Sequence, residues 1–533
     1  MDTVEVHDRP AATAEGPLRA PSDRGQHIAE WLPHYARTQP DRPALANLDT
    51  GETRTWAELE DRVGRLAHSL RHDLGLQAGE RIVSLTNGDL RCFELQFACL
   101  RAGLIWAPLN FRFAAPELAH ACAQIAPSLM ITDAEWSEVA AQVAGLAGGM
   151  RLISWSGEDA EFEHLARTPH RMAERPYAGA DEPAFILMTS GTTDRPKAAV
   201  VTRGGLFWQA INQMQFCRVA EPNSHVFVPL PLFHAGGLNS LCNPVLYFGG
   251  SVTVSARFDA DTTARFVGDP ANGVTHLALV PLMYQMMADS PGFGQTDLSG
   301  MRCIICAGGR LPERLRAAFA ARGGVFTTQY GGTETGPTIT AMDVRRQDKI
   351  LEGSCGQQAL HVQIRLVGPD GRDVAVGEPG EVWVRGPAVI PRYIARDREL
   401  DFVGDWFRTG DVARQDADGF YFIVDRIKEM YKSGGENVAP AEVELVLGEH
   451  PAISEVAIIG VPDERWGEVG LAVVVPAAGA DLTVESLRAF CEGRLARFKH
   501  PRRMAFVDAL PRNVTGKIAR DDLRRRFGGS KTV

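Results

Sequence analysis

Cysteine, positive charge and long apolar helices are all in short supply in this sequence of 533 residues. Its nine cysteines follow no disulfide framework, and the one close pair, Cys303 and Cys306, lies in an apolar run. A zinc or redox role would need a second pair or a nearby histidine, and the sequence offers neither close by. Because free cysteine behaves as a small apolar residue, the run predicts a buried strand in a reduced, cytoplasmic protein.

Basic side chains are outnumbered by acidic ones, 56 to 66, which leaves a formal net charge of −10. A general nucleic-acid binder needs a basic face that replaces the counterions of phosphate, so we exclude that class. Residues 222–256 contain no charged side chain, yet prolines and glycines interrupt them, which argues against integral membrane contact. Residues 1–24 are polar and lack an apolar core, so we predict a flexible tail rather than a signal peptide.

Lysine is the rarest charged residue. Seven of the 56 basic residues are lysines, which leaves 49 arginines. Because arginine serves as the general surface cation here, a retained lysine indicates a position that needs a compact ammonium group. Four of the seven lie in glycine-rich or turn-rich segments, namely Lys197, Lys428, Lys432 and Lys517.

The chain is too long for a single hydrophobic core, and its pattern changes along the way. Up to about residue 330, apolar runs such as residues 81–85 and 129–132 alternate with helical patterns, which predicts βαβ units and mostly parallel sheets. Beyond about residue 367 the alternation of residues 380–386 indicates antiparallel strands. We predict an α/β protein with a large N-terminal domain at residues 25–425 and a small α+β domain at residues 426–533.

A loop rich in hydroxyl groups follows an apolar strand at residues 188–197, with the sequence Met-Thr-Ser-Gly-Thr-Thr-Asp-Arg-Pro-Lys. Small hydroxyl side chains and free backbone N–H groups can surround phosphate oxygens, and Lys197 adds a cation. The Walker pattern G-x-x-x-x-G-K-[ST] does not occur in the sequence. Taken alone, the loop is also compatible with a plain polar connection after a strand.

Together with six further motifs in the same order, this loop resembles the adenylate-forming superfamily, which includes acyl-CoA synthetases, adenylation domains and firefly-type luciferases. The further motifs are Pro-Leu-Phe-His at 231–234, Tyr-Gly-Gly-Thr-Glu at 330–334, Trp-Phe-Arg-Thr-Gly-Asp at 406–411, Asp-Arg-Ile-Lys at 425–428, Lys-Ser-Gly-Gly-Glu-Asn at 432–437 and Pro-Arg-Asn-Val-Thr-Gly-Lys at 511–517. The match spans residues 25–527. It implies a small β-barrel-like part in the large domain and a mobile C-terminal domain.

The resemblance implies ATP, Mg²⁺ and coenzyme A as cosubstrates and cofactor. The residues expected to bind ATP or AMP are Thr189, Ser190, Gly191, Thr192, Thr193, Lys197, Gly308, Gly309, Tyr330, Gly331, Asp411 and Arg426. Thr333 would bond the α-phosphate, and Glu334 would bind Mg²⁺, which prefers carboxylate oxygen. Lys517 would bridge the acid carboxylate and the α-phosphate, where two anions must be brought together.

The resemblance also implies two half-reactions at one site, exchanged by rotation of the small domain about a hinge at Lys428. The tunnel for the coenzyme A thiol would be formed by Lys432, Ser433, Gly434 and Gly435. His234 would act as a gate or contact the acid, although a satisfied core histidine is an alternative. The acid pocket would include Trp208, Asn212, Phe233, Gly237, Gly332 and Thr338. This lining lacks an obvious charge, which favours a neutral medium-chain, alicyclic or aryl acid over an amino acid, and a deeper fatty-acid tunnel is an alternative.

Some positions depart from the family pattern. Asp194 stands where the phosphate loop usually has glycine, and its negative charge would weaken ATP binding; Ala198, Arg310 and Arg392 are further departures. None removes a proposed catalytic group. The main prediction is an acid–CoA ligase that forms an acyl-adenylate and then a thioester. An amine or a carrier protein in trans as acceptor, and a non-catalytic sensor, are the alternatives. We expect a monomer or homodimer.

Overall fold

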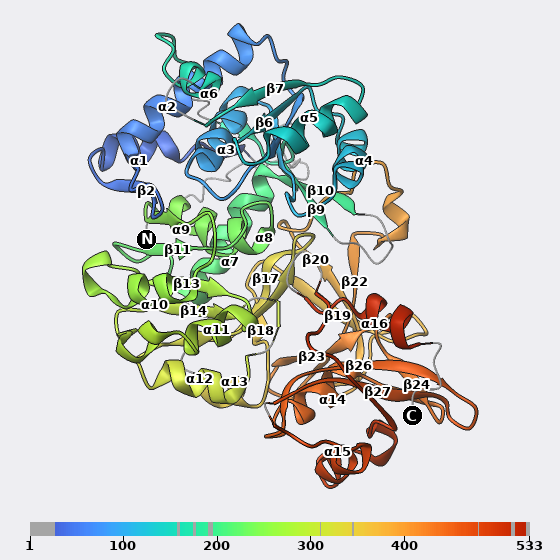
Figure 1. Ribbon diagram of the computed structural model, residues 1–533. Helices are drawn as coiled ribbons and strands as arrows, with labels where there is room; N and C mark the ends of the chain where they lie inside the picture. Colours follow the sequence, from blue (N-terminus) through green and yellow to red (C-terminus); the bar gives the residue numbers. More distant parts are fainter. Residues whose placement is uncertain are drawn as a thin grey trace, which may run out of the picture.

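The computed structural model describes residues 27–156, 160–173, 177–189, 196–306, 308–309, 311–343, 346–477, 479–512 and 517–528 (Figure 1). It has an α/β architecture with two large mixed sheets, antiparallel sheets after them and a separate C-terminal region, so the predicted fold class is confirmed. No helix among the described residues is both long enough and apolar enough to span a bilayer.

The first large sheet has six strands. In spatial order they are β10 (Lys197–Thr202), β9 (Pro183–Thr189), β5 (Ile105–Pro108), β4 (Arg81–Leu85), β6 (Leu129–Thr132) and β7 (Arg151–Ser154). All pairs are parallel except β9 with β10. Its neighbouring helices are α3 (Arg91–Ala102), α4 (Ala115–Ile125), α5 (Ser137–Leu146) and α6 (Glu161–Leu165). A short pair, β1 (His27–Ala29) and β8 (Tyr177–Gly179), is separate.

The second large sheet has seven strands. They are β15 (Phe326–Thr327), β14 (Cys303–Cys306), β13 (His276–Leu279), β11 (His225–Val228), β12 (Ser251–Val254), β2 (Pro43–Asn47) and β3 (Thr53–Thr55), parallel except for the β2–β3 pair. Its neighbouring helices are α1 (Leu32–Thr38), α2 (Trp56–His68), α7 (Arg203–Cys217), α8 (Ala235–Gly237), a π-helical turn η2 (Leu238–Cys242), α9 (Asn243–Tyr247), α10 (Ala260–Gly268), α11 (Pro281–Ala288) and α12 (Glu313–Ala320). Helix α13 (Gln347–Leu351) follows later in the chain, and its Ile350 packs with Phe420 and Phe422. All nine cysteines are free and buried, and Cys303 and Cys306 lie on β14 as predicted.

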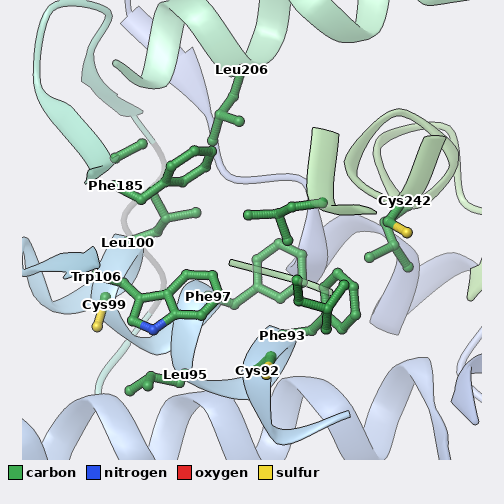
Figure 2. Packing of buried hydrophobic residues seen from close by; sticks show 14 of the residues in the cluster. Cys92, Phe93, Leu95, Phe97, Cys99, Leu100, Trp106, Phe185, Leu206 and Cys242 are labelled. Carbon is green, nitrogen blue, oxygen red and sulfur yellow. The ribbon is translucent and has the colours of Figure 1, made fainter. Parts of the chain in front are cut away.

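The two large sheets share one core because α3 is buried on every side. Residues 92–102 of this helix are all buried, which is typical of a helix enclosed on all sides. In Figure 2 the α3 side chains Phe93 and Phe97 lie among Trp106 of β5, Phe185 of β9 and Leu206 of α7. The same cluster continues to the second sheet. The relative placement of the two sheets, and of α7 between them, therefore rests on tight packing.

Antiparallel sheets follow the two large sheets. One joins β16 (Gln329–Gly332), β17 (Gly336–Ala341) and β18 (Gln357–Gln358). The next joins β19 (Gln363–Val367), β20 (Gly380–Arg385), β22 (Trp406–Gln415) and β21 (Phe402–Val403), and β23 (Tyr421–Arg426) pairs with β22. This second sheet contains the antiparallel strands expected from the alternating pattern after residue 367, and it is the half-barrel that the resemblance implies.

The C-terminal region has its own sheet and core. Its strands are β25 (Glu436–Val438), β24 (Tyr431–Ser433), β27 (Gly467–Pro476) and β26 (Ile453–Asp463), with β28 (Arg503–Phe506) paired to β27. Its helices are α14 (Pro440–Leu447), α15 (Val484–Cys491) and α16 (Arg520–Phe527). The half-barrel sheet ends at Arg426 and this sheet begins at Tyr431, close to where the sequence predicts the domain boundary.

Candidate active site

Asp411 connects side chains from three strands. Asp411 on β22 lies directly opposite Arg426 on β23, and Arg426 Nε is 2.8 Å from Asp411 Oδ1. The Tyr330 hydroxyl on β16 donates to Asp411 Oδ2 at 2.7 Å. Burial and the negative charge of Asp411 raise the pKa of Tyr330, so the phenol stays a donor. Because each carboxylate oxygen has two lone pairs, Asp411 can still accept further hydroxyl groups, as the predicted ribose contact requires.

Glu334 lies in the turn between β16 and β17, beside Thr333. Its Oε1 accepts a hydrogen bond from the Tyr393 hydroxyl at 2.8 Å, which orients the side chain, and its backbone carbonyl accepts one from Ile390 N at 2.8 Å, which holds the turn. Among the described residues no group of three His, Cys, Asp or Glu side chains is placed to hold a metal ion. A single half-buried carboxylate nevertheless fits Mg²⁺, which is usually held by one or two carboxylates, substrate phosphates and water.

Lys517 reaches this cluster from the C-terminal region. A Cβ atom at Gly308 would lie 3.4 Å from Lys517 Cε, which places the lysine against the segment after β14. Protein atoms crowd its ammonium group, although the side chain keeps contact with solvent, and this loss of hydration, followed by the charge of Arg426, lowers its pKa. Asp411 and Glu334 act in the opposite direction. The one lysine predicted to carry the first step therefore lies within the field of three predicted nucleotide and metal contacts.

His234 precedes α8 and lies near Lys517. Its Nδ1 accepts a hydrogen bond from Gly236 N at 3.1 Å, which caps the short helix. Burial and the positive charge of Lys517 lower the pKa of His234 to about 4, so the imidazole is neutral at pH 7. A neutral ring suits the predicted gate or acid contact, and the cap explains why a histidine is tolerated there.

Lys197, the last residue of the predicted phosphate loop, begins strand β10. Its Nζ lies 3.0 Å from Asp401 Oδ1 and 5.0 Å from the ring centroid of Tyr393. Burial favours the neutral form of Asp401, but bonds to Arg396 and Lys197 outweigh it and lower the pKa of the carboxyl. No motif in the sequence indicates this partner. Residues 190–195, which include the predicted contacts Ser190, Gly191, Thr192 and Thr193 and the departure Asp194, lie outside the described residues.

Two glycines of the predicted nucleotide site have different surroundings. A Cβ atom at Gly331 would lie 2.3 Å from the carbonyl oxygen of Gly336, so β16 and β17 can approach this closely only without a side chain there. Gly309 is exposed, with Pro281 as its nearest neighbour. Thr189 ends β9, and its hydroxyl is buried with no hydrogen-bond partner among the described residues.

The predicted acid-pocket residues fall into three groups. Thr338 on β17 donates to Gln213 of α7, and Asn212 precedes that glutamine; both residues are buried. The aromatic members pack on other rings: Phe233 lies 5.1 Å from Phe111, and Trp208 lies 4.5 Å from His361, measured between ring centroids. The remaining members, Gly237 and Gly332, lie in close backbone turns.

The predicted thiol tunnel and hinge lie in the C-terminal region. Lys432, Ser433, Gly434 and Gly435 form the β24–β25 hairpin, where Gly434 N donates to Trp466 O at 2.9 Å. Lys428 is exposed in the turn after β23. Asp425 connects the two sides of this turn: its Oδ2 accepts a hydrogen bond of 2.9 Å from the backbone N–H of Ala441, at the start of α14. The structure therefore presents Lys517, rather than the hairpin, to the Asp411 cluster.

Known proteins show strong similarity to the whole chain. Residues 32–394 match the AMP-binding enzyme family, and residues 442–517 match the AMP-binding enzyme C-terminal domain. A feruloyl-CoA synthase from Amycolatopsis sp is 39% identical over 509 residues, covering 95% of this chain and 100% of the relative. An indoleacetate–CoA ligase from Aromatoleum aromaticum is 36% identical over 510 residues, covering 93% of this chain and 98% of the relative.

Comparison with solved structures points to the same family. The o-succinylbenzoate CoA synthetase from Bacillus subtilis, in complex with its acyl-adenylate intermediate, is similar with a TM-score of 0.81 and 28% identity, covering 94% of this chain and 98% of that chain. The chain therefore belongs to the AMP-binding enzymes, as its resemblance to the adenylate-forming superfamily predicts.

The phenol of Tyr393 gives a first testable prediction. Replacing Tyr393 by phenylalanine removes the hydrogen bond to Glu334 and keeps the ring beside Lys197. Because a group that orients a metal ligand affects metal affinity, we expect the Mg²⁺ concentration for half-maximal pyrophosphate release to rise about tenfold, with little change at saturating Mg²⁺. Tyr421→Phe, at an equally buried tyrosine of β23, is the matched control. An unchanged Mg²⁺ dependence in Tyr393→Phe would show that Glu334 needs no such support.

Proposed function

We propose that this protein is an AMP-forming ligase that joins an aryl carboxylic acid to coenzyme A. The acid–CoA ligase class expected from the sequence is confirmed by similarity over nearly the whole chain to named CoA ligases. The aryl class of the acid and the roles of individual residues are the new elements. The residue roles are carried by the position of Lys517 near Gly308, His234 and the Asp411–Arg426 pair, and the aryl class by the aromatic, uncharged pocket lining.

In the first half-reaction, Asp411 and Arg426 would hold the ribose, with Tyr330 beside the adenine. Thr333 would bond the α-phosphate and Glu334 would hold Mg²⁺, which screens phosphate charge when bound. Lys517 would then contact both the acid carboxylate and the α-phosphate. An acid oxygen forms a bond to the α-phosphorus while the bond from that phosphorus to the bridging oxygen breaks, and pyrophosphate leaves with the electron pair.

In the second half-reaction, the Gly434–Gly435 hairpin would replace Lys517 at the same site after rotation near Lys428. The thiolate of coenzyme A attacks the acyl carbon, and AMP leaves with the electron pair of the broken C–O bond. His234 would stand between the acid pocket and the thiol tunnel. Because its imidazole is neutral, it can contact the acyl group without binding the carboxylate as an ion.

The pocket and the relatives support an aryl acid. Phe233 and Trp208 place aromatic rings among the predicted pocket residues, and none of the six carries a charge. An uncharged, partly aromatic lining favours a flat neutral acid, because ring faces and edges pack well against each other. The two relatives reported above are named for ferulic and indoleacetic acids, both aromatic.

A panel of acids tests the proposal. Pyrophosphate release would be measured with ATP, Mg²⁺ and matched aryl, alicyclic and aliphatic acids, with coenzyme A, with amino acids or without acceptor, and products identified by mass spectrometry. We expect multiple turnovers to aryl-CoA thioesters and AMP. An amide without thioester, or a preference for aliphatic acids, would overturn the proposal.

A further inference from the structure

One amide side chain on helix α7 is buried and has no hydrogen-bond partner in the described part of the chain. Asn212 is 1% exposed, and neither its Oδ1 nor its Nδ2 has a hydrogen-bond partner among the described residues. Its neighbour Gln213 is 0% exposed but fully engaged: it donates to Ser240 O and accepts from Thr338. Buried polar groups in proteins are nearly always paired, so an amide that is empty at both ends indicates a partner supplied from outside the chain.

The position of Asn212 connects it to the substrate side of the active site. Residues 209, 212 and 213 share one face of α7, because they are three and four positions apart. Both neighbours of Asn212 on this face contact β17. Gln213 accepts a hydrogen bond from Thr338, and Gln209 Cγ lies 3.0 Å from where a Cβ atom at Gly336 would be. Strand β17 follows shortly after Thr333 and Glu334. The face of α7 that carries Asn212 therefore packs against β17, the strand that follows the turn with the predicted phosphate and metal contacts.

The atoms left empty define the chemistry of the partner. Asn212 offers one carbonyl acceptor and an NH2 group with two N–H donors. Oε1 of the 3%-exposed Gln209 is a second acceptor without a partner among the described residues. The group that satisfies them must both donate and accept a hydrogen bond. A neutral amide pairs with a neutral group, so a charged substituent is disfavoured, and an aliphatic chain would leave every one of these atoms empty.

We propose that Asn212 is a specificity-determining residue that hydrogen-bonds a hydroxyl group on the aromatic ring of the acid. The inference rests on the proposed aryl acid–CoA ligase function and deepens it, because it assigns a substituent to the ring and a residue that recognises it. A site built to bond a hydroxyl discriminates strongly against the analogue that lacks it, since its own buried polar atoms are then unpaired.

Matched pairs of acids test this assignment. The pairs are 4-hydroxycinnamic with cinnamic acid and 4-hydroxyphenylacetic with phenylacetic acid, and kcat/KM is measured by pyrophosphate release at saturating ATP and coenzyme A. For the best pair we expect the wild type to favour the hydroxylated acid by about 10–100-fold. In Asn212→Leu this ratio falls to about one. The variant loses kcat/KM with the hydroxylated acid, while its kcat/KM with the acid that lacks the hydroxyl is equal to or higher than that of the wild type.

Two readouts separate recognition from a structural role. Met214→Leu, at a residue of the same helix that is 41% exposed, should keep the wild-type ratio. The melting temperature of Asn212→Leu should be equal or higher, because the change removes a buried amide that has no partner among the described residues.

Each other outcome overturns the inference. Equal loss with both acids of a pair would mean that Asn212 supports the fold or holds a water molecule. A wild type that makes thioesters from aryl acids without preferring a hydroxyl would reject the inference alone. No thioester from any aryl acid would reject the proposed function and the inference together.

Discussion

Replacing Lys517 by alanine is expected to lower the rate of acyl-adenylate formation by about 100–1,000-fold, the usual effect of removing one preorganised charge at a reacting centre. The ammonium group is the cation that the C-terminal region brings beside Gly308 and the Asp411–Arg426 pair. Thioester formation from a supplied acyl-adenylate should stay within a few-fold of wild type, because the small domain then presents its other face. The two rates are measured separately, by pyrophosphate release and by thioester formation.

A second lysine of the small domain provides the control. Lys499 is ion-paired with Glu442 at 2.6 Å, so Lys499→Ala removes a lysine without touching the site. Adenylation needs the charged form of Lys517, and the pKa of this lysine is lowered. The adenylation rate should therefore fall as the pH rises, and the fall should begin at a pH below the ordinary lysine pKa of about 10.4. Lys517→Arg should remove this alkaline limb, because arginine stays protonated. Equal loss of both half-reactions in Lys517→Ala would contradict the assignment.

Replacing Asp411 by asparagine is expected to raise the KM for ATP by about 10–100-fold, since a hydrogen bond to a charged group contributes about 1.5–3 kcal/mol. The carboxylate is bonded to Arg426 and Tyr330, so its loss removes the proposed ribose acceptor and leaves both neighbours without their anion. Steady-state kinetics in ATP and calorimetric titration with AMP measure the effect. The matched control is Asp405→Asn, at an exposed carboxylate just before β22. An unchanged affinity for AMP would show that the ribose binds elsewhere.

Much of the architecture is predictable from the sequence because local pattern and fold agree. Residues 81–85, 129–132 and 303–306 form strands with the predicted bounds, since apolar runs of this length satisfy a buried parallel sheet. Motifs also identify residues that are distant in sequence yet meet in space: Tyr330 bonds Asp411, 81 positions away. These contacts follow from the resemblance, which carries information that periodicity does not.

Other parts of the site have no local signal. The pairing of Lys197 with Asp401 depends on two segments 204 positions apart, and Asp401 lies in no motif. The bond from Tyr393 to Glu334 is equally dependent on the folded chain. The lack of a partner for Asn212 among the described residues is a property of packing, because the adjacent Gln213 takes Ser240 and Thr338 as its own partners. Such side-chain partners are decided only when the sheets and α7 are held in one core.

The position of Arg426 has a consequence for how the enzyme would turn over. This residue ends β23, is held to Asp411 on the neighbouring strand, and immediately precedes the segment that leads into the small domain. If the small domain rotates about this point, the rotation axis passes near the proposed ribose site, where atoms are displaced least. A nucleotide bound close to the rotation axis need not be released and rebound between the two half-reactions. Only groups farther from the axis, namely Lys517 and the Gly434 hairpin, would have to exchange positions.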